Sequence, residues 1–404
     1  MEHERKADSG KELAVSIFTN EYPPNVYGGA GVHVDYLSRE LSKIMQVEVR
    51  CFGDQRLDSG RLRVKGYSPW DFVAADSNAA SGPARIFGPM TTDIAMVRDP
   101  VTSNIVHCHT WYTFWAGFLA KALYGVPLVV TVHSLEPLRP WKEEQLGRAY
   151  RLSKWLEETG INAADRIVAV SGGMKGDILS CYHVPEDRII VIHNGIDLDE
   201  YRKAPAQAEA VRQKYGIAER YVLFVGRVSR QKGIMHLLDA AALLPEDVQV
   251  VLCATAPDTK ELEDELRTRV EHSKNVLWVD KMLPREELIG LYSGASVFVC
   301  PSIYEPFGII NLEAMACEVP VVASAVGGNK DVVVHSETGF LVEPGNPPEL
   351  AAAITRLLED GPLARSFGLR GRKRVEDHFS WTAIAKKTKD MYLEALASLP
   401  ETLS

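Results

Sequence analysis

Short apolar runs alternate with amphipathic stretches along most of the chain. The apolar runs are typical of buried strands, and eleven of them stand out: 13–19, 47–52, 105–107, 128–132, 167–170, 189–192, 221–225, 248–252, 276–279, 297–300 and 319–323. The stretches between them have helical spacing, as after the first run, where Val34, Leu37, Leu41 and Ile44 share one face. Strands that alternate with helices in this way form parallel sheets covered on both faces, so the pattern predicts an α/β fold.

Two domains are expected from the length and from one change in composition. A chain of 404 residues exceeds what one hydrophobic core usually serves. After Asn194-Gly195-Ile196-Asp197 the sequence turns polar and alanine-rich as far as Gly216, and a second set of apolar runs follows. We predict a disordered lead-in over 1–12 and two tandem doubly wound, Rossmann-like domains over 13–200 and 201–380. Such domains bind ligands beyond the carboxyl ends of their strands, so we expect the active site in the cleft between them.

Charge and cysteine content argue against several kinds of partner. The formal net charge is −9 and the isoelectric point is about 5.7, with no basic block, which disfavours nucleic-acid and anionic-membrane partners. The six cysteines are scattered without a Cys-x-x-Cys spacing, which indicates buried thiols in a reducing compartment and gives no zinc site. The first eleven residues lack the apolar core of a signal peptide, and no stretch approaches a membrane span. We therefore expect a cytoplasmic enzyme.

The run from Glu305 to Glu313 places two carboxylates on either side of a glycine turn that opens a helix. A helix start presents unpaired backbone N–H groups, so Gly308 and Ile309 can approach a phosphate while the two acids reach sugar hydroxyls. This arrangement suits a sugar nucleotide. The spacing is also common on exposed helices, so the interpretation depends on the other motifs.

A second loop, directly after the run 221–225, carries Arg227 and Lys232 between two glycines. A fork-shaped guanidinium and a compact ammonium on one loop can neutralise a diphosphate together. The alternative is a pair of solvated cations. The flanking glycines and the position after a strand favour the binding role.

Three further groups of residues follow strands at the same predicted edge of the first domain. Gly28, Gly29 and Gly31 form a loop whose backbone can approach a phosphate or a sugar, although it is not a Gly-x-Gly-x-x-Gly fingerprint. His109 and His133 follow the runs 105–107 and 128–132. A lone histidine is more often structural, but this placement favours a site residue.

Together these motifs resemble the retaining glycosyltransferases of GT-B fold, and within that family the bacterial glycogen synthases of actinobacterial type. The resemblance runs from about Leu13 into the final helix and rests on five segments: Tyr22-Pro23-Pro24, Gly28 to His33, Thr131 to Lys142, Gly226-Arg227 with Lys232-Gly233, and Glu305 to Glu313. The segment from His133 to Lys142 is the most particular to the glycogen-synthase branch.

The resemblance implies catalytic roles for Arg227, Lys232, Glu305 and His133. Arg227 and Lys232 would hold the donor diphosphate, Glu305 would bind hydroxyls of the donor sugar, and His133 would contact the donor glucose. The remaining implied binding residues are Gly308 and Ile309 for the distal phosphate, Glu313 for the ribose, Gly28, Gly29 and Gly31 closing from the opposite domain, and His109, Asn194 and Ser171 in the cleft.

Two further expectations come from the resemblance. The final helix, 381–399, would cross back onto the first domain. The Lys-x-Gly-Gly loop of the larger ADP-glucose-dependent synthases is here Val26-Tyr27-Gly28-Gly29, which leaves the base of the donor open.

The mechanism is expected to be front-face substitution without a metal or a cofactor. A covalent intermediate would need a carboxylate beneath the anomeric carbon, and the sequence reveals no clear one. In the front-face route, the departing diphosphate oxygen takes the proton of the acceptor hydroxyl. The protein then mainly stabilises the leaving diphosphate by Arg227, Lys232 and helix N-termini.

We therefore predict a glycogen synthase that transfers glucose from a nucleotide-glucose, with ADP-glucose favoured over UDP-glucose, to the non-reducing end of an α-1,4-glucan. The alternatives are an α-maltose-1-phosphate synthase, whose acceptor is glucose 1-phosphate, and another hexosyltransferase of this fold. A nicotinamide-dependent oxidoreductase is disfavoured by the missing dinucleotide fingerprint, and an exported sugar-binding protein by the missing signal peptide. The oligomeric state is left open.

Overall fold

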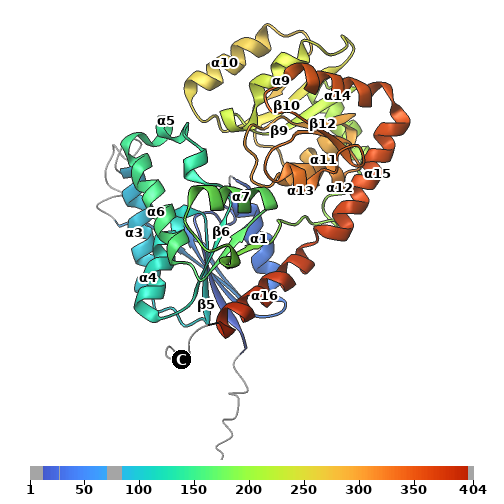
Figure 1. The fold of residues 1–404 in the computed structure, drawn as a ribbon. Helices are drawn as coiled ribbons and strands as arrows, with labels where there is room; N and C mark the ends of the chain where they lie inside the picture. The colour runs from blue at the N-terminus through green and yellow to red at the C-terminus, as the bar shows by residue number, and fades with distance from the viewer. Residues whose placement is uncertain (1–11, 27, 71–83, 399–404) are drawn as a thin grey trace, which may run out of the picture.

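The structure, a computed structural model, describes residues 12–26, 28–70 and 84–398 and consists of two α/β domains, one above the other (Figure 1). Apart from Glu12, the predicted lead-in lies outside the described residues, as does Tyr27 of the glycine loop. The prediction of two Rossmann-like domains is confirmed.

The first domain is built on an eight-stranded sheet in the order β3-β4-β2-β1-β5-β6-β7-β8. All neighbouring strands are parallel except β3, which pairs antiparallel with β4. The strands are β1 (Ala14–Thr19), β2 (Gln46–Phe52), β3 (Arg56–Ser59), β4 (Leu62–Tyr67), β5 (Ile105–His109), β6 (Leu128–Val132), β7 (Arg166–Ala169) and β8 (Ile189–Val191).

Helices cover both faces of this sheet. Val15 and Ile17 of β1 belong to a hydrophobic cluster with residues of α1 and α16 on one face of the sheet. Phe18 belongs to a second hydrophobic cluster, on the opposite face. Apolar side chains are needed on both sides of the central strands, which explains their continuous apolar runs. The helices are α1 (Gly29–Ser42), α3 (Ala84–Arg98), α4 (Phe114–Tyr124), α5 (Lys142–Leu146), α6 (Tyr150–Ala163), α7 (Gly172–Cys181) and α16 (Trp381–Ala397).

The second domain has a six-stranded parallel sheet in the order β11-β10-β9-β12-β13-β14. Its strands are β9 (Tyr221–Arg227), β10 (Gln249–Thr255), β11 (Val276–Val279), β12 (Val297–Cys300), β13 (Val321–Ser324) and β14 (Gly339–Val342). Its helices are α8 (Pro205–Tyr215), α9 (Ile234–Ala241), α10 (Lys260–Glu271), α11 (Arg285–Gly294), α12 (Ile309–Ala316), α13 (Asn329–Val332), α14 (Pro347–Glu359) and α15 (Gly361–His378).

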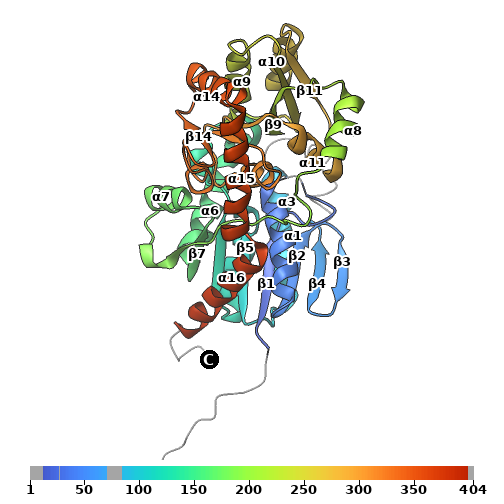
Figure 2. The ribbon, with the colours of Figure 1, turned by 90° about the vertical axis from the view of Figure 1, so that its right-hand side faces the viewer.

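The chain crosses between the domains twice, and the two crossings lie side by side. The N–H group of Ile196 in the first crossing donates to the carbonyl oxygen of Phe379 in the second at 2.9 Å. Next to them, a Cβ on Gly195 would lie 2.7 Å from a ring atom of Trp381, so only glycine fits against that ring. Figure 2 shows α15 descending from the second domain and α16 continuing along the first.

All eleven predicted strands are present, although several differ by a few residues at their ends. Strands β3, β4 and β14 were not predicted. The predicted connection as far as Gly216 is partly the helix α8, which packs against α11. Ile44 lies beyond the end of α1 and is 38% exposed, so it does not share the buried face of Val34, Leu37 and Leu41.

All six cysteines are free thiols, five of them buried and Cys181 half-buried. Within the described parts of the chain, no helix has both the length and the apolar character needed to cross a membrane.

Candidate active site

A cavity of about 480 Å³ lies between the two domains. It is lined by residues that end or follow strands of both sheets, including Asn20 and Glu21 after β1, His133 after β6, Arg227 at the end of β9, and Glu305 after β12. This edge, where parallel strands end, is where doubly wound sheets bind ligands.

Lys232 and Glu305 form a nearly buried ion pair on the second-domain side of the cavity. The Lys232 ammonium lies 2.6 Å from Oε2 of Glu305, and the two side chains are only 16% and 6% exposed. The hydroxyl of Ser302 also donates to this oxygen at 2.9 Å. The tight turn after Lys232 requires glycine, because Gly233 has φ +64° and a Cβ there would lie 2.0 Å from the carbonyl oxygen of Pro301.

Arg227 lies beside this pair and is held by a different carboxylate. Its Nη1 donates to Oδ1 of Asp258 at 2.8 Å. The Arg227 side chain is 30% exposed toward the cavity that it lines. Two cations from one loop thus face the same space, each fixed by an acid.

Helix α12 points its N-terminus at the cavity. Gly308 caps it with φ +93°, and a Cβ there would lie 2.7 Å from Nδ2 of Asn311 and 2.8 Å from Oδ1 of Asn329. One turn into the helix, Glu313 accepts a hydrogen bond from the Tyr292 hydroxyl at 2.6 Å. Burial raises the pKa of Glu313, against the opposing effect of hydrogen bonds from Tyr292 and Tyr201.

The glycine loop of the first domain faces this helix across the cavity. The N–H group of Gly28 donates to Oε2 of Glu21 at 2.8 Å, and a Cβ on Gly29 would lie 3.4 Å from Cδ1 of Ile309. A Cβ on Gly31 would clash with Glu21 at 2.8 Å. Gly31 therefore serves the packing of the loop and does not line the cavity.

Four histidines form a cluster behind the first-domain wall. His33, His107 and His109 are buried, and His133 reaches the cavity. Nδ1 of His109 lies 3.0 Å from Nε2 of His133, and Nδ1 of His33 lies 2.6 Å from Oδ1 of Asn194. Burial lowers the pKa of His33 to about 4 and of His107 to about 3, and it lowers the pKa of His109 and His133 well below the usual value. The cluster is therefore uncharged at neutral pH.

Arg139 and Lys142 add a second pair of cations from the first domain, and the sequence assigned them no role. Nη1 of Arg139 donates to Oγ of Ser134 at 3.0 Å, and it lies 3.6 Å from Oε1 of Glu136. Nε of Arg139 is buried and has no hydrogen-bond partner among the described residues. Burial, together with the positive charges of Arg139 and Arg227, lowers the pKa of Lys142 to about 8.

Ten of the thirteen implied site residues line this cavity, and the exceptions are Gly31, His109 and Ser171. Ser171, expected in the cleft, caps α7 and donates to the carbonyl oxygen of Pro306 at 2.7 Å, so it joins the domains. Glu21 and Tyr112 also line the cavity and were not predicted. Only their position after a strand or in a loop could have indicated them.

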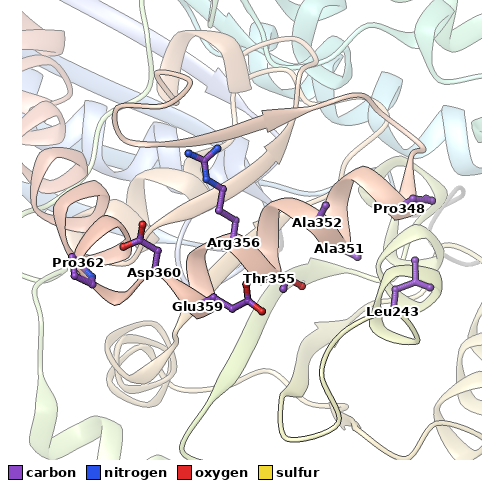
Figure 3. Close-up of a pocket in the computed structure, with 9 residues that line it drawn as sticks. All are labelled: Leu243, Pro348, Ala351, Ala352, Thr355, Arg356, Glu359, Asp360 and Pro362. Atoms are coloured by element: carbon purple, nitrogen blue, oxygen red, sulfur yellow. The ribbon is translucent and has the colours of Figure 1, made fainter.

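A shallower hollow of about 760 Å³ lies on the second domain along α14 (Figure 3). Its residues, among them Leu243, Arg356 and Glu359, are all different from those of the interdomain cavity. In Figure 3 the charged groups of Arg356 and Glu359 point in different directions and do not converge.

Comparison with known proteins gives two family matches that together cover most of the chain. Residues 27–200 match the family described as Glycosyltransferase Family 4, and residues 207–374 match Glycosyl transferases group 1. The alpha-maltose-1-phosphate synthase of Mycolicibacterium smegmatis is 44% identical over 95% of this chain and 100% of its own length. The glycogen synthase of Mycobacterium tuberculosis is 29% identical over 95% of both chains.

Solved structures share the fold. Sucrose-phosphate synthase from Thermosynechococcus elongatus superimposes with a TM-score of 0.78 at 24% identity, covering 96% of this chain and 100% of that one. The catalytic domain of Starch Synthase IV from Arabidopsis thaliana, bound to ADP and acarbose, gives 0.77 at 17% identity with the same coverage.

Proposed function

Since the chain belongs to the GT-B glycosyltransferases, we propose that it transfers glucose from a nucleotide-glucose, preferably ADP-glucose, to glucose 1-phosphate, which forms α-maltose 1-phosphate. The donor half of this proposal rests on Arg227, Lys232 and the N-terminus of α12, which converge on one side of the cavity. Two cations and a helix start are suited to a diphosphate. Glu305 and Glu313 then bind hydroxyls of the donor.

The observation that carries the choice of acceptor is the second pair of cations. Arg139 and Lys142 come from the first domain and line the same cavity as Arg227 and Lys232. The lowered pKa of Lys142 reflects the closeness of Arg139 and Arg227 in addition to burial, and positive charges held together in this way favour a second anionic group. A phosphate on the acceptor supplies that group, whereas an uncharged glucan does not. The relatives named alpha-maltose-1-phosphate synthase support the same choice.

The reaction proceeds by front-face substitution at the anomeric carbon. The bond from C1 of the donor glucose to the distal diphosphate oxygen breaks while the 4-hydroxyl oxygen of the acceptor bonds to the same face of C1. The proton of that hydroxyl passes to the departing oxygen, so atoms and charge balance. Negative charge grows on the diphosphate, and Arg227 and Lys232 stabilise it.

A matrix of donors and acceptors tests the proposal. Purified protein in excess EDTA is assayed with ADP-, UDP- and GDP-glucose against glucose 1-phosphate, glucose and glycogen. We expect the highest kcat/KM with ADP-glucose and glucose 1-phosphate, and activity that persists in the chelator. Efficient extension of glycogen with little reaction of glucose 1-phosphate would instead establish a glycogen synthase. Loss of activity in EDTA that magnesium restores would contradict the metal-free mechanism.

The variant Lys142→Met separates the two acceptors further. A charge-assisted hydrogen bond contributes about 1.5–3 kcal/mol, so the KM for glucose 1-phosphate should rise roughly 10- to 100-fold. The matched control is Arg148→Gln, which removes an exposed cation from the same segment and should leave this KM unchanged. Equal KM values for wild type and Lys142→Met would exclude Lys142 from acceptor binding.

A further inference from the structure

Three histidines from separate elements of the first domain converge behind the cavity wall. His33 lies in α1, His109 ends β5, and His133 follows β6. One ring nitrogen from each lies within 4.8 Å of the other two. The ring centroids are 4.9 Å apart for His33 and His133, 5.2 Å for His33 and His109, and 5.3 Å for His109 and His133. The three rings thus form a compact, nearly equilateral group.

The hydrogen bonds of His33 leave one of its nitrogens available. Its Nδ1 lies 2.6 Å from the amide oxygen of Asn194, which can only accept, so the proton sits on Nδ1. The lone pair is then on Nε2, which is buried and has no partner among the described residues. Nε2 of His109 is also buried and has no partner among the described residues, and Nδ1 of His109 lies 3.0 Å from Nε2 of His133. With the proton of His109 on Nδ1, this contact uses the lone pair on Nε2 of His133, so His133 would bind an ion through Nδ1 or give up this hydrogen bond. Two buried imidazole nitrogens without partners require an explanation, and a missing ion or water is the usual one.

We propose that His33, His109 and His133 form a binding site for Zn²⁺ or another divalent transition metal that prefers imidazole. Zinc bound by three histidines at about 2.0–2.1 Å keeps its ligand nitrogens about 3.4 Å apart in tetrahedral geometry. In the structure the three ring nitrogens lie within 4.8 Å of one another, so small movements of the rings would bring them to this spacing. Asn194 would orient His33 through Nδ1, as carbonyl groups commonly do for histidine ligands. No cysteine is needed, which is why a search for cysteine spacings finds no such site.

The neighbouring His107 is excluded from the site by its own hydrogen bonds. Its Nδ1 lies 2.6 Å from the hydroxyl of Tyr392, and its Nε2 lies 2.6 Å from Oγ1 of Thr131. Both nitrogens are therefore engaged. The structure thus distinguishes three candidate ligands from a fourth histidine packed against them.

The metal would enter from the interdomain cavity. Both His133 and Asn194 line it, so the fourth coordination position opens toward the donor site. An ion bound here occupies a ring nitrogen of His133, the residue assigned to the donor glucose. It therefore inhibits the reaction in competition with the donor. This consequence rests on the proposed function, whereas the binding of the metal does not.

Metal binding is tested first without any activity assay. Full-length protein is stripped with a chelator, the chelator is removed, and Zn²⁺ is titrated by calorimetry, with Co²⁺ bound in parallel to report four-coordination by its visible absorption. We expect one tight equivalent in the wild type, weakened at least tenfold in His33→Gln and in His133→Gln. The control His183→Gln removes an exposed histidine and should keep the site.

Several outcomes would overturn the proposal. A wild-type protein that binds no stoichiometric zinc overturns it, whether or not the variants fold, and so does unchanged affinity in folded His33→Gln and His133→Gln. If zinc binds but does not compete with ADP-glucose in a working assay, the inhibitory role fails. If no donor supports any reaction, the proposed function fails, and the stoichiometry of zinc still decides this inference separately.

Discussion

Lys232 and Arg227 each hold an acid of the second domain while facing the cavity, Lys232 through Glu305 and Arg227 through Asp258. Negative charge grows on the diphosphate as the glycosidic bond breaks, so Lys232→Ala and Arg227→Ala should each lower kcat by about 10²- to 10³-fold. The double variant should lose less than the product of the two effects, since both cations serve one group. Steady-state kinetics on the singles and the double measure this.

The matched control for these variants is Arg230→Ala, which removes an exposed cation from the same turn. Circular dichroism verifies that all four proteins are folded. If a single variant of Lys232 or Arg227 keeps near-normal kcat, that residue does not stabilise the departing diphosphate.

Glu157 gives a prediction about pH. It accepts hydrogen bonds from the Tyr182 hydroxyl at 2.5 Å and from the N–H group of Glu136 at 2.9 Å. Burial, and then the negative charge of Glu136, raises the pKa of Glu157 from 4.5 to about 8. Between these two values the folded protein binds a proton that the unfolded chain has released. The contribution of Glu157 to the free energy of unfolding is therefore fully present below pH 4.5. As the pH rises above this value, the contribution falls by up to about 1.4 kcal/mol per pH unit.

The substitution Glu157→Gln removes this titrating group, so the free energy of unfolding should depend less on pH. Relative to wild type, the variant should gain stability steadily between about pH 5 and pH 8. Urea unfolding at several pH values measures the difference, and Glu158→Gln, one position along the same helix, serves as control. A constant difference between wild type and Glu157→Gln across this range would show that Glu157 keeps an ordinary pKa.

Among the site residues, those found from the sequence follow strands or open a helix, because the edge of a parallel sheet fixes where such residues lie. Arg139 and Lys142 have no strand directly before them, so only the folded segment after β6 reveals that they face the cavity. His109 and Gly31 are next to true cavity residues in sequence but do not line the cavity themselves. The direction of a side chain depends on packing that no spacing encodes.

The start of helix α12 depends on Gly308, and this gives a prediction at the level of an element. Its φ is +93°, and an added Cβ would lie 2.7 Å and 2.8 Å from two side-chain atoms, so Gly308→Ala should cost about 1–3 kcal/mol in unfolding free energy. It should also raise the KM for the donor, because the N–H groups of α12 shift. Thermal unfolding and donor kinetics measure both effects.

The control for this change is Gly176→Ala in α7, where a Cβ meets no atom within 4 Å. This substitution should leave stability unchanged or raise it by up to about 1 kcal/mol, since alanine is the better helix former. If Gly308→Ala behaves like this control, the left-handed cap is not required.

At the same level, the sequence missed three strands, β3, β4 and β14. All four residues of β3 are exposed, so the strand has no apolar pattern to detect. Strand β14 has only four residues and directly follows a turn. Helix α8 is hidden in a stretch of polar composition, and only its Ala208 and Val211 are buried, so the sequence predicts a connection there.

At the scale of the whole molecule, Asp331 links the two domains. Its Oδ2 accepts from the N–H group of Gly172 at 2.7 Å and lies 3.1 Å from Nε2 of His193. Asp331→Ala should shift the molecule toward a more open arrangement by roughly tenfold, or about 1.4 kcal/mol. Small-angle scattering should show a larger radius of gyration, which a bound donor nucleotide reverses.

Asp247→Ala is the matched control, because this acid pairs with Arg220 inside the second domain. It should leave the radius of gyration unchanged. A compact Asp331→Ala protein would mean that the contacts of Ser171 and Tyr304 suffice to hold the domains together.

The two-domain architecture was predictable because two sets of strands of similar length follow one another along the chain. The acceptor that we propose was only the alternative from the sequence, because its support comes from cations that the fold brings together from both domains. Arg139 and Arg227 are far apart in sequence and lie in different domains, but both line the cavity and both lower the pKa of Lys142.

The paired crossings have a consequence for how the molecule is made. The ribosome completes the second domain before it delivers Trp381, Ile384 and Tyr392, which belong to the same hydrophobic cluster as Val15 and Ile17. On this face of the sheet α1 is already present, but the part that α16 covers stays exposed, although the first domain is synthesised first, until the last helix emerges. This reverses the usual N-terminal-first order of domain folding. Nascent chains arrested before Trp381 would thus carry a finished second domain and a protease-sensitive first one.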